Sequence, residues 1–285
     1  MLPDVLSAAL RALSFVALFQ AAGAAIFVAT FRKDLGDSLH AIRRIAQFAG
    51  LAALAFVLLH LALEAGRMAG SLGGVLDPAL QKRVLTSSVG TVAALRVAGL
   101  TLLLVGVRGR NGFAWVLAVT GANLALFSFA LIGHTAVDSA RWMLAPLLLA
   151  HVFIVAFWFG ALLPLRAVAK HDPYVSAGEV VDRFSRIAFW LVPGILIAGT
   201  ILSVALVPDL TVLRQPYGTL LLAKVAGFTV LMALAAWNKW RLGPAIKRGD
   251  GLAIARFKRV VAFEYALISG VLAITAVLTS FFSPE

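Results

Sequence analysis

Long apolar stretches, separated by short polar loops, follow one another along the chain. A helix needs about 20 apolar residues to cross the hydrocarbon core of a bilayer. Eight stretches meet this length, at about residues 6–31, 45–63, 89–107, 113–133, 142–169, 184–207, 218–240 and 260–282. The pattern therefore predicts an all-α membrane protein, a bundle of eight transmembrane helices. The first stretch is too long for the apolar core of a signal peptide and follows no basic segment, so we expect a retained span.

The composition supports a chain that lies mostly in lipid. Hydrophobic residues make up 61% of the 285 residues and charged residues only 13%, about half the charged share of a typical soluble domain. The loops are too short for a soluble domain, so we expect one membrane domain over residues 1–285. The absence of cysteine excludes thiolate metal sites. The motifs of soluble enzymes, such as a phosphate-binding glycine loop or His-Glu-x-x-His, are also missing, so we expect no enzyme.

The positive charge predicts how the bundle is oriented. The net charge is +12, and the loops after the first, third, fifth and seventh stretches carry about three times as many Lys and Arg residues as the opposite side. Basic loops face the cytoplasm in most membrane proteins, so we expect both termini on the outer (periplasmic) side. This distribution indicates a membrane lipid environment and no nucleic-acid partner.

Ionisable side chains inside a membrane span are costly and mark a functional site by default. His60 and Glu64 close the second stretch at its outer end. They are four residues apart and share one helix face, which Met68 extends if the helix continues.

A second group of polar side chains lies between the fourth and fifth stretches, on the same predicted outer side. His134 ends the fourth stretch, and Asp138 and Met143 follow it. His151 lies roughly 13 Å deeper, nine residues into the fifth stretch. Asn123, three helical turns before His134, is expected at the depth of His151.

Three histidines on one side favour a metal site, because imidazole is the commonest protein metal ligand and suits copper. We predict a copper ion bound by His60, His134 and His151, with Glu64 as a candidate fourth ligand. The alternative interpretation is that each histidine is a hydrogen-bonded packing residue or an interfacial anchor.

Two cations also fall inside predicted spans. Arg96 and Lys224 need partners if they are buried, and Glu64 and Asp138 are the acids nearest in depth; snorkelling to the interface is the alternative. Trp158 shares a helix face with His151, and packing is a commoner role for it than gating.

Near the opposite end of the bundle, Glu264 lies just inside the last stretch. It either accepts protons or gates a path, or it pairs with Lys258 or Arg259 at the start of the same stretch. We favour the pairing.

Several short segments, in this order and spacing, resemble the copper resistance protein D (CopD) family. The resemblance is clearest over residues 133–285. It rests on Gly133-His134-Thr135-Ala136, His151, the segment Trp158 to Leu165, Arg183 to Arg186, Pro216-Tyr217-Gly218, Lys224, Asn238 and Thr279-Ser280.

The resemblance implies a multi-pass protein of the bacterial inner (cytoplasmic) membrane that moves copper ions across it. It also implies a periplasmic copper-binding partner of the CopC type. The positions carried over from the family are His134 and His151, with Tyr217 and Lys224 shaping the site.

Two other functions stay open at this point. Two of the histidines could be the axial ligands of a haem b in an electron-transfer protein. Alternatively, the protein binds copper as a scaffold and does not transport it. The ligand types fit both copper oxidation states, since imidazole and carboxylate tolerate copper(II) and thioethers favour copper(I).

Overall fold

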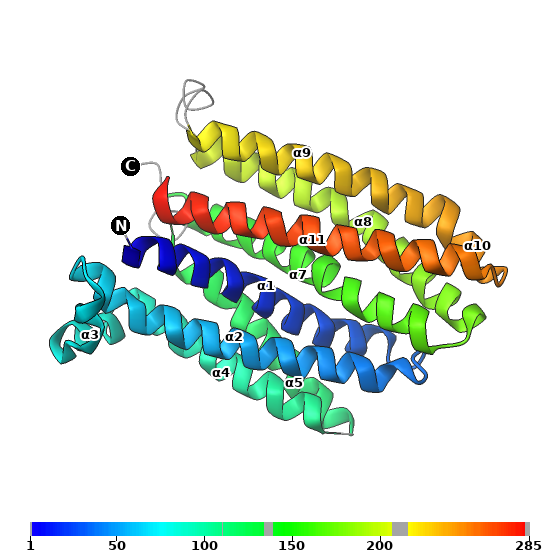
Figure 1. The fold of residues 1–285 in the computed structure, drawn as a ribbon, viewed down its shortest axis with the longest axis horizontal. Coiled ribbons are helices and arrows are strands. Elements are labelled where there is room, and N and C mark those ends of the chain that lie inside the picture. Colours follow the sequence, from blue (N-terminus) through cyan, green and yellow to red (C-terminus); the bar gives the residue numbers. More distant parts are fainter. Residues whose placement is uncertain (1, 110, 134–138, 207–215, 283–285) are drawn as a thin grey trace.

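The computed structural model describes residues 2–109, 111–133, 139–206 and 216–282, and these residues form helices and loops without a strand (Figure 1). Eight helices are long and apolar enough to cross a membrane, which confirms the predicted all-helical bundle. The helices are α1 (Leu2–Phe31), α2 (Ser38–Met68), α4 (Ser88–Arg108), α5 (Gly112–Phe127) with η2 (Ser128–Leu131), α7 (Arg141–His171), α8 (Tyr174–Leu206), α9 (Pro216–Trp237) and α11 (Gly251–Phe281).

Helix α1 is the centre of the bundle. It packs against α2, α5, α7 and α11 and lies between α2 and α7 in Figure 1. Its middle turns consist of small residues, and Ala21, Ala22, Ala24 and Ala25 are fully buried. Small side chains let helix backbones approach closely in a membrane, so this segment allows several helices to gather around α1.

The closest approach joins α1 to α7. A side chain on Gly160 would lie only 2.7 Å from the carbonyl oxygen of Phe19 and would collide with Gly23. Nearby, the Gln20 side chain donates to the Gly160 carbonyl oxygen (3.0 Å). The two glycines therefore fix the spacing of the helices that carry the candidate site.

The two ends of the bundle differ in structure. The N- and C-terminal ends of the chain lie at one end, here called the termini end (Figure 1). There the segment after α2 folds into η1 (Leu72–Leu76) and α3 (Pro78–Leu85). Gln81 holds this segment against α2 by donating to the carbonyl oxygens of Ala62 (3.0 Å) and Val75 (2.8 Å).

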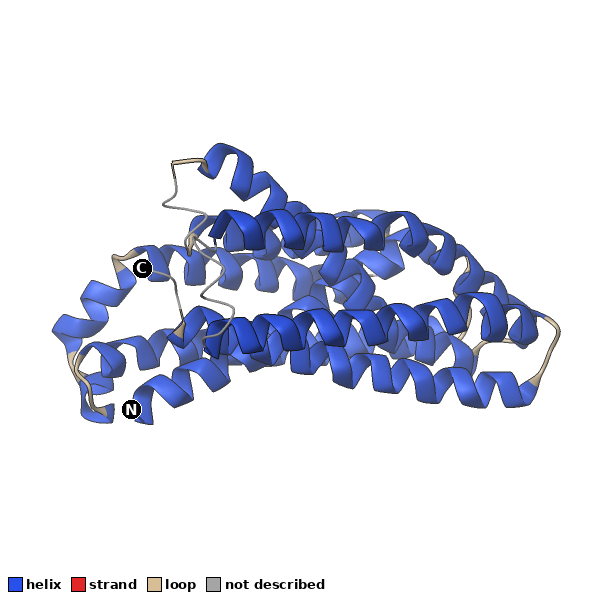
Figure 2. Ribbon diagram, turned by 90° about the horizontal axis from the view of Figure 1, so that it is seen from above, coloured by secondary structure: helices blue, strands red, loops and turns tan. Residues whose placement is uncertain are grey.

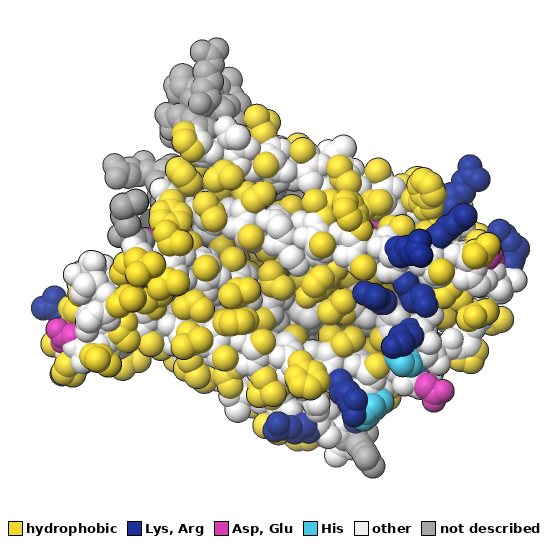
Figure 3. Space-filling view, in the orientation of Figure 1, with side chains coloured by type: hydrophobic (Ala, Val, Ile, Leu, Met, Phe, Trp, Pro, Cys, Tyr) yellow, Lys and Arg dark blue, Asp and Glu magenta, His cyan; other side chains and the backbone are white. Residues whose placement is uncertain are grey.

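At the opposite end, lysine and arginine side chains form a band, and the flank between the two ends is mainly hydrophobic (Figure 3). We call this the basic end. The helices run alongside one another between the two ends (Figures 1 and 2). The arrangement agrees with basic loops on one side of a membrane; that this side is the cytoplasm stays a prediction.

The chain after α9 departs from a regular helix. A π-helical turn, η4 (Asn238–Leu242), leads into α10 (Gly243–Lys247). The Gly243 N–H donates to the Asn238 carbonyl five residues earlier. Pro244 follows directly, and a proline inside a helix clashes with the carbonyl four residues before it. The π-helical turn η4 includes the carbonyl four residues before Pro244, with which the proline ring would clash in a regular α-helix.

Candidate metal centre

His60 and Glu64 lie together at the termini end, where α2 packs against α1. The His60 Nε2 is 3.3 Å from the Glu64 Oε1, which confirms that the two residues share a face. Ser7 on α1 completes the group: its hydroxyl is 3.1 Å from the His60 Nε2 and donates to the Glu64 Oε1 (3.2 Å). His60 and Glu64 are only 15% and 12% exposed, so this is a largely buried polar cluster.

The Glu64 carboxylate already has a cationic partner. Arg67 Nη1 donates to both carboxylate oxygens at 3.0 Å, and its Nε donates to Asp4 (3.4 Å). Charge-assisted pairs of this kind are stronger than neutral hydrogen bonds. A metal ion must therefore compete with Arg67 for Glu64, a competitor that the sequence hypothesis left out although Arg67 is one turn after Glu64.

Two further arginines, Arg11 and Arg96, lie near His60. Like Arg67, both are close enough to act on the imidazole electrostatically. Arg11 donates to the Thr279 carbonyl oxygen at the end of α11 (3.0 Å). The cluster is therefore rich in positive charge, which repels a metal cation from His60. A metal ion can bind there only if a ligand brings negative charge with it or one of the arginines moves away.

Arg96 does not pair with any acid that the structure describes. Its Nε donates to the Ser128 hydroxyl (2.9 Å), and its guanidinium lies 4.6 Å from the centre of the Phe129 ring. Of the two acids nearest in depth, Glu64 is therefore not the partner of Arg96, because Arg67 contacts both oxygens of that carboxylate; Asp138 lies outside the described residues. The 3-10 turn η2 supplies a hydroxyl and an aromatic face to Arg96 instead.

His151 lies on α7 and faces α8. Its Nδ1 is 3.2 Å from the carbonyl oxygen of Ile195, and its ring is 3.5 Å from where a side chain on Gly199 would begin. A carbonyl only accepts, so Nδ1 carries the proton, and in the neutral ring Nε2 presents a lone pair. Metal-binding histidines characteristically have this second hydrogen bond, which fixes the tautomer.

Lys224 of α9 lies within electrostatic range of His151. Among the described residues it makes no hydrogen bond and no ion pair with an acid. Tyr217, seven residues before it, is half-buried. Both described candidate histidines therefore have positive charge nearby: Lys224 for His151, and the three arginines for His60.

The other predicted supporting residues occupy different surroundings. Met68 and Met143 are 56% and 45% exposed, so their thioethers lie on the surface. Asn123 is half-buried. Trp158 is 4% exposed and packs edge-on against Phe228, with ring centres 6.4 Å apart, which is the packing role that we favoured.

The described residues do not assemble the whole predicted site. Within residues 2–133, 139–206 and 216–282, apart from residue 110, no group of three or more His, Asp or Glu side chains could hold a metal ion. His60 contacts α1, whereas His151 contacts α8. His134 and Asp138 lie outside the described residues, so the three-histidine site stays a prediction.

The sequence analysis named Glu264 as a candidate proton acceptor but did not predict its buried polar partner, Asn238. Glu264 on α11 is 2% exposed and accepts a hydrogen bond from the Asn238 Nδ2 (3.0 Å). The pairing of Glu264 with Lys258 or Arg259 is therefore wrong, because the carboxyl turns into the bundle and the Arg259 side chain is exposed. The sequence signal was an amide and a carboxyl at matching depths of neighbouring spans.

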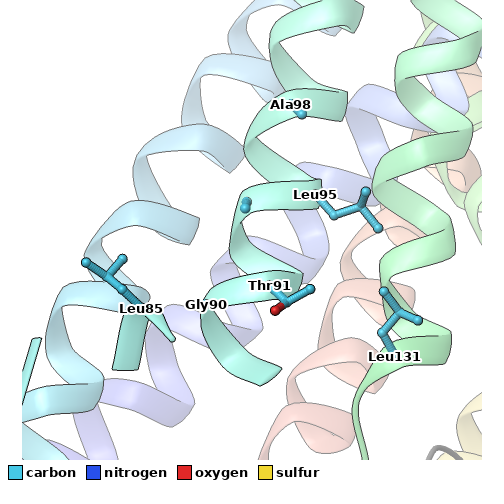
Figure 4. Close-up of a pocket in the computed structure, with 7 residues that line it drawn as sticks. Leu85, Gly90, Thr91, Leu95, Ala98 and Leu131 are labelled. Atoms are coloured by element: carbon cyan, nitrogen blue, oxygen red, sulfur yellow. The ribbon is translucent and has the colours of Figure 1, made fainter. Parts of the chain in front are cut away.

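The described residues also line a groove of about 500 Å³ between α4, η2 and the end of α3 (Figure 4). Apart from Thr91 its lining is apolar: Leu85, Gly90, Ala94, Leu95, Ala98 and Leu131.

A smaller groove, of about 210 Å³, lies at the basic end. Its lining is basic and consists of His40, Arg43, Arg44, Gln47, Val107 and Arg108. Neither groove has a carboxylate ligand for a metal.

The fold and these side chains define a polytopic helical membrane protein that carries largely buried histidines. Residues 1–144 match the family model described as copper resistance protein D-like, N-terminal domain. Residues 178–278 match the model described as copper resistance protein D. The chain therefore belongs to the copper resistance protein D family. The family likeness also covers the N-terminal half, where the short motifs are less distinct.

Two relatives align over much of their length. The inner membrane protein YebZ of Escherichia coli (strain K12) is 25% identical over 286 residues, which cover 95% of this chain and 96% of YebZ. Copper resistance protein D of Pseudomonas syringae pv. tomato is 28% identical over 210 residues, 68% of this chain and 67% of the relative. No solved structure matches. With eight apolar helices, these likenesses identify a multi-pass inner-membrane protein.

Proposed function

We propose that this protein binds copper ions at the termini end of the bundle and moves them across the inner membrane. The observation that carries the proposal is membership of the copper resistance protein D family. Copper is here the cargo, and the chain supplies its ligands. Imidazole nitrogens suit copper, and the two described candidates, His60 and His151, lie on α2 and α7.

His151 is the ligand that the geometry supports best. The hydrogen bond from its Nδ1 to the Ile195 carbonyl orients the ring and leaves Nε2 as a donor atom for copper. The backbone of Gly199 makes room for the ring. Because this second contact comes from α8, copper bound to His151 would stabilise the α7–α8 contact.

His60 and Glu64 would act as a second, conditional position. Glu64 can ligate copper only when Arg67 leaves the carboxylate, and Asp4 is already in place to hold Arg67 (3.4 Å). Copper that reaches Glu64 would therefore replace Arg67 as the cation that neutralises this carboxylate, while Arg67 stays paired with Asp4. We propose His134, which lies outside the described residues, as the ligand that links the two positions.

A periplasmic copper-binding protein of the CopC type is the proposed partner. If the termini end faces the periplasm, η1 and α3 project there beside the His60 cluster. A partner that delivers copper already bound to anionic side chains would offset the positive charge of the three arginines.

Elemental analysis of detergent-purified protein, loaded with copper and washed, tests the binding. We expect near-stoichiometric copper in the wild type and in His171→Ala, a control at an exposed histidine of the basic end. His151→Ala should lose most of that copper while keeping its helical content. Iron with a Soret band would instead indicate haem, and the absence of both metals would contradict copper binding.

A further inference from the structure

Glu264 and Asn238 form a buried polar contact toward the basic end of the bundle, separate from the histidines. Glu264 is 2% exposed and Asn238 is 7% exposed. Glu264 lies thirteen residues into α11, roughly 20 Å along the helix from Gly251. An ionised carboxyl group at such a position costs free energy in a membrane, and an ionisable residue there marks a functional site by default.

The hydrogen bonds around the pair do not balance if Glu264 is ionised. The Asn238 Nδ2 donates to the Glu264 Oε1 (3.0 Å). The other end of the amide, Oδ1, is buried and has no hydrogen-bond partner in the described part of the chain. A carboxylate has acceptors only, so it cannot satisfy that oxygen, and a buried acceptor without a donor costs about 1–3 kcal/mol.

Among the described residues, no cation forms an ion pair that would offset a negative charge at Glu264. The elements packed against α11 are α1, α7, α9, η4 and α10, and none of their described Lys, Arg or His side chains forms an ion pair with Glu264. Lys247 of α10 pairs with Asp182 instead (3.2 Å), and the Lys239 Nζ of η4 lies 3.5 Å from the centre of the Phe189 ring. Tyr265 stacks on Phe159 of α7. On α11 itself Lys258 and Arg259 lie nearer the basic end, where Arg259 is exposed.

We propose that Glu264 and Asn238 form a proton-binding site. When Glu264 carries a proton, its O–H can donate to the Asn238 Oδ1 while the Asn238 Nδ2 donates to the other carboxyl oxygen. This acid–amide pair has two hydrogen bonds, no net charge and no unsatisfied oxygen on the amide. Protonation of Glu264 therefore accounts for both observations: it supplies the hydrogen-bond donor that the Asn238 Oδ1 lacks, and the neutral carboxyl group needs no cation partner.

The local backbone supplies a second, independent reason. Asn238 is the first residue of the π-helical turn η4, and its carbonyl accepts from the Gly243 N–H. One-turn π insertions inside α-helices occur frequently at functional sites. Asn238 is buried and contacts Glu264 from the start of this turn, so the chain departs from a regular α-helix at the residue that contacts Glu264.

Release of this proton toward the basic end would leave a buried carboxylate with an amide donor. The bundle thus contains a group whose charge changes by one with a single proton. This inference does not depend on copper binding, and its test requires no metal.

Infrared spectroscopy of the full chain in lipid vesicles at neutral pH tests the site. A protonated carboxyl has a carbonyl stretch that is distinct from the carboxylate bands and shifts in deuterated water. We expect this band in the wild type and in Glu179→Gln, a control at an exposed glutamate. Glu264→Gln should remove it, and the glutamine amide can still donate to the Asn238 Oδ1, so the variant is expected to fold.

A second variant keeps Glu264 and changes its partner. Asn238→Ala removes the amide donor, and we expect the carbonyl band to move to higher frequency because the bond from Nδ2 is lost. The proposal is overturned if the wild type has no protonated-carboxyl band at neutral pH. It is equally overturned if the band survives Glu264→Gln, or if Asn238→Ala leaves its frequency unchanged.

Discussion

The Glu64 carboxylate contacts a hydroxyl, an imidazole and a guanidinium at once. The helical spacing places His60 and Glu64 on one face, and this part of the candidate site could be predicted from the sequence. The contribution of Ser7 and the nearby charge of Arg11 could not, because both come from α1, far earlier in the chain, and depend on how α1 and α2 pack.

Replacing Arg67 tests how strongly it competes with copper for Glu64. In Arg67→Ala the carboxylate loses the cation that contacts both of its oxygens, and the site loses one positive charge. We expect copper(II) to bind about tenfold more tightly, which corresponds to about 1.4 kcal/mol. The measurement is a copper titration of the purified protein.

Arg141→Ala is the matched control, because Arg141 is an exposed arginine at the start of α7. It should leave copper affinity unchanged. Equal or weaker binding by Arg67→Ala would show that Glu64 contributes no ligand to copper.

The helices themselves follow from apolar runs, and the eight predicted spans agree with the eight long apolar helices in the described part of the chain. Their ends were harder to predict. Helix α11 begins at Gly251 rather than near residue 260, because Asp250 caps it by accepting from the Leu252 and Ala253 N–H groups and the first turns carry polar residues. The π-helical turn η4 gave no periodic signal, since it is only five residues long and three of them, Asn238, Lys239 and Arg241, are polar.

The crossing of α1 and α7 depends on glycine at residue 160. In Gly160→Ala the new methyl group would lie 2.7 Å from the Phe19 carbonyl oxygen, and both backbones would have to separate. Overpacking of this kind costs about 1–3 kcal/mol, so we expect thermal unfolding in detergent at a clearly lower Tm.

Gly270→Ala provides the comparison on α11, because a side chain there would meet no neighbouring atom within 4 Å. Its Tm should equal or exceed that of the wild type. A Tm for Gly160→Ala that is not below that of Gly270→Ala would contradict the tight crossing.

Across the bundle, charge is distributed unevenly between the two ends, and this asymmetry predicts the orientation. The chain contains no cysteine, so single cysteines can be labelled without background. We expect an impermeant maleimide to label Ser71→Cys in intact spheroplasts, and Lys170→Cys only after the membrane is permeabilised. Both residues are exposed, at opposite ends of the bundle. The reverse labelling pattern would place the termini end, with His60, in the cytoplasm.

Transport of copper into vesicles that contain the purified protein tests the central claim most directly. The reporter is a copper-sensitive dye in the lumen. The wild type and His171→Ala should both give a rising luminal signal after copper is added outside. In His151→Ala the signal should fall to that of protein-free vesicles, although the variant inserts normally. A luminal signal in His151→Ala equal to that of the wild type would contradict the role proposed for this histidine, and copper that stays on the wild-type protein without reaching the lumen would indicate a scaffold.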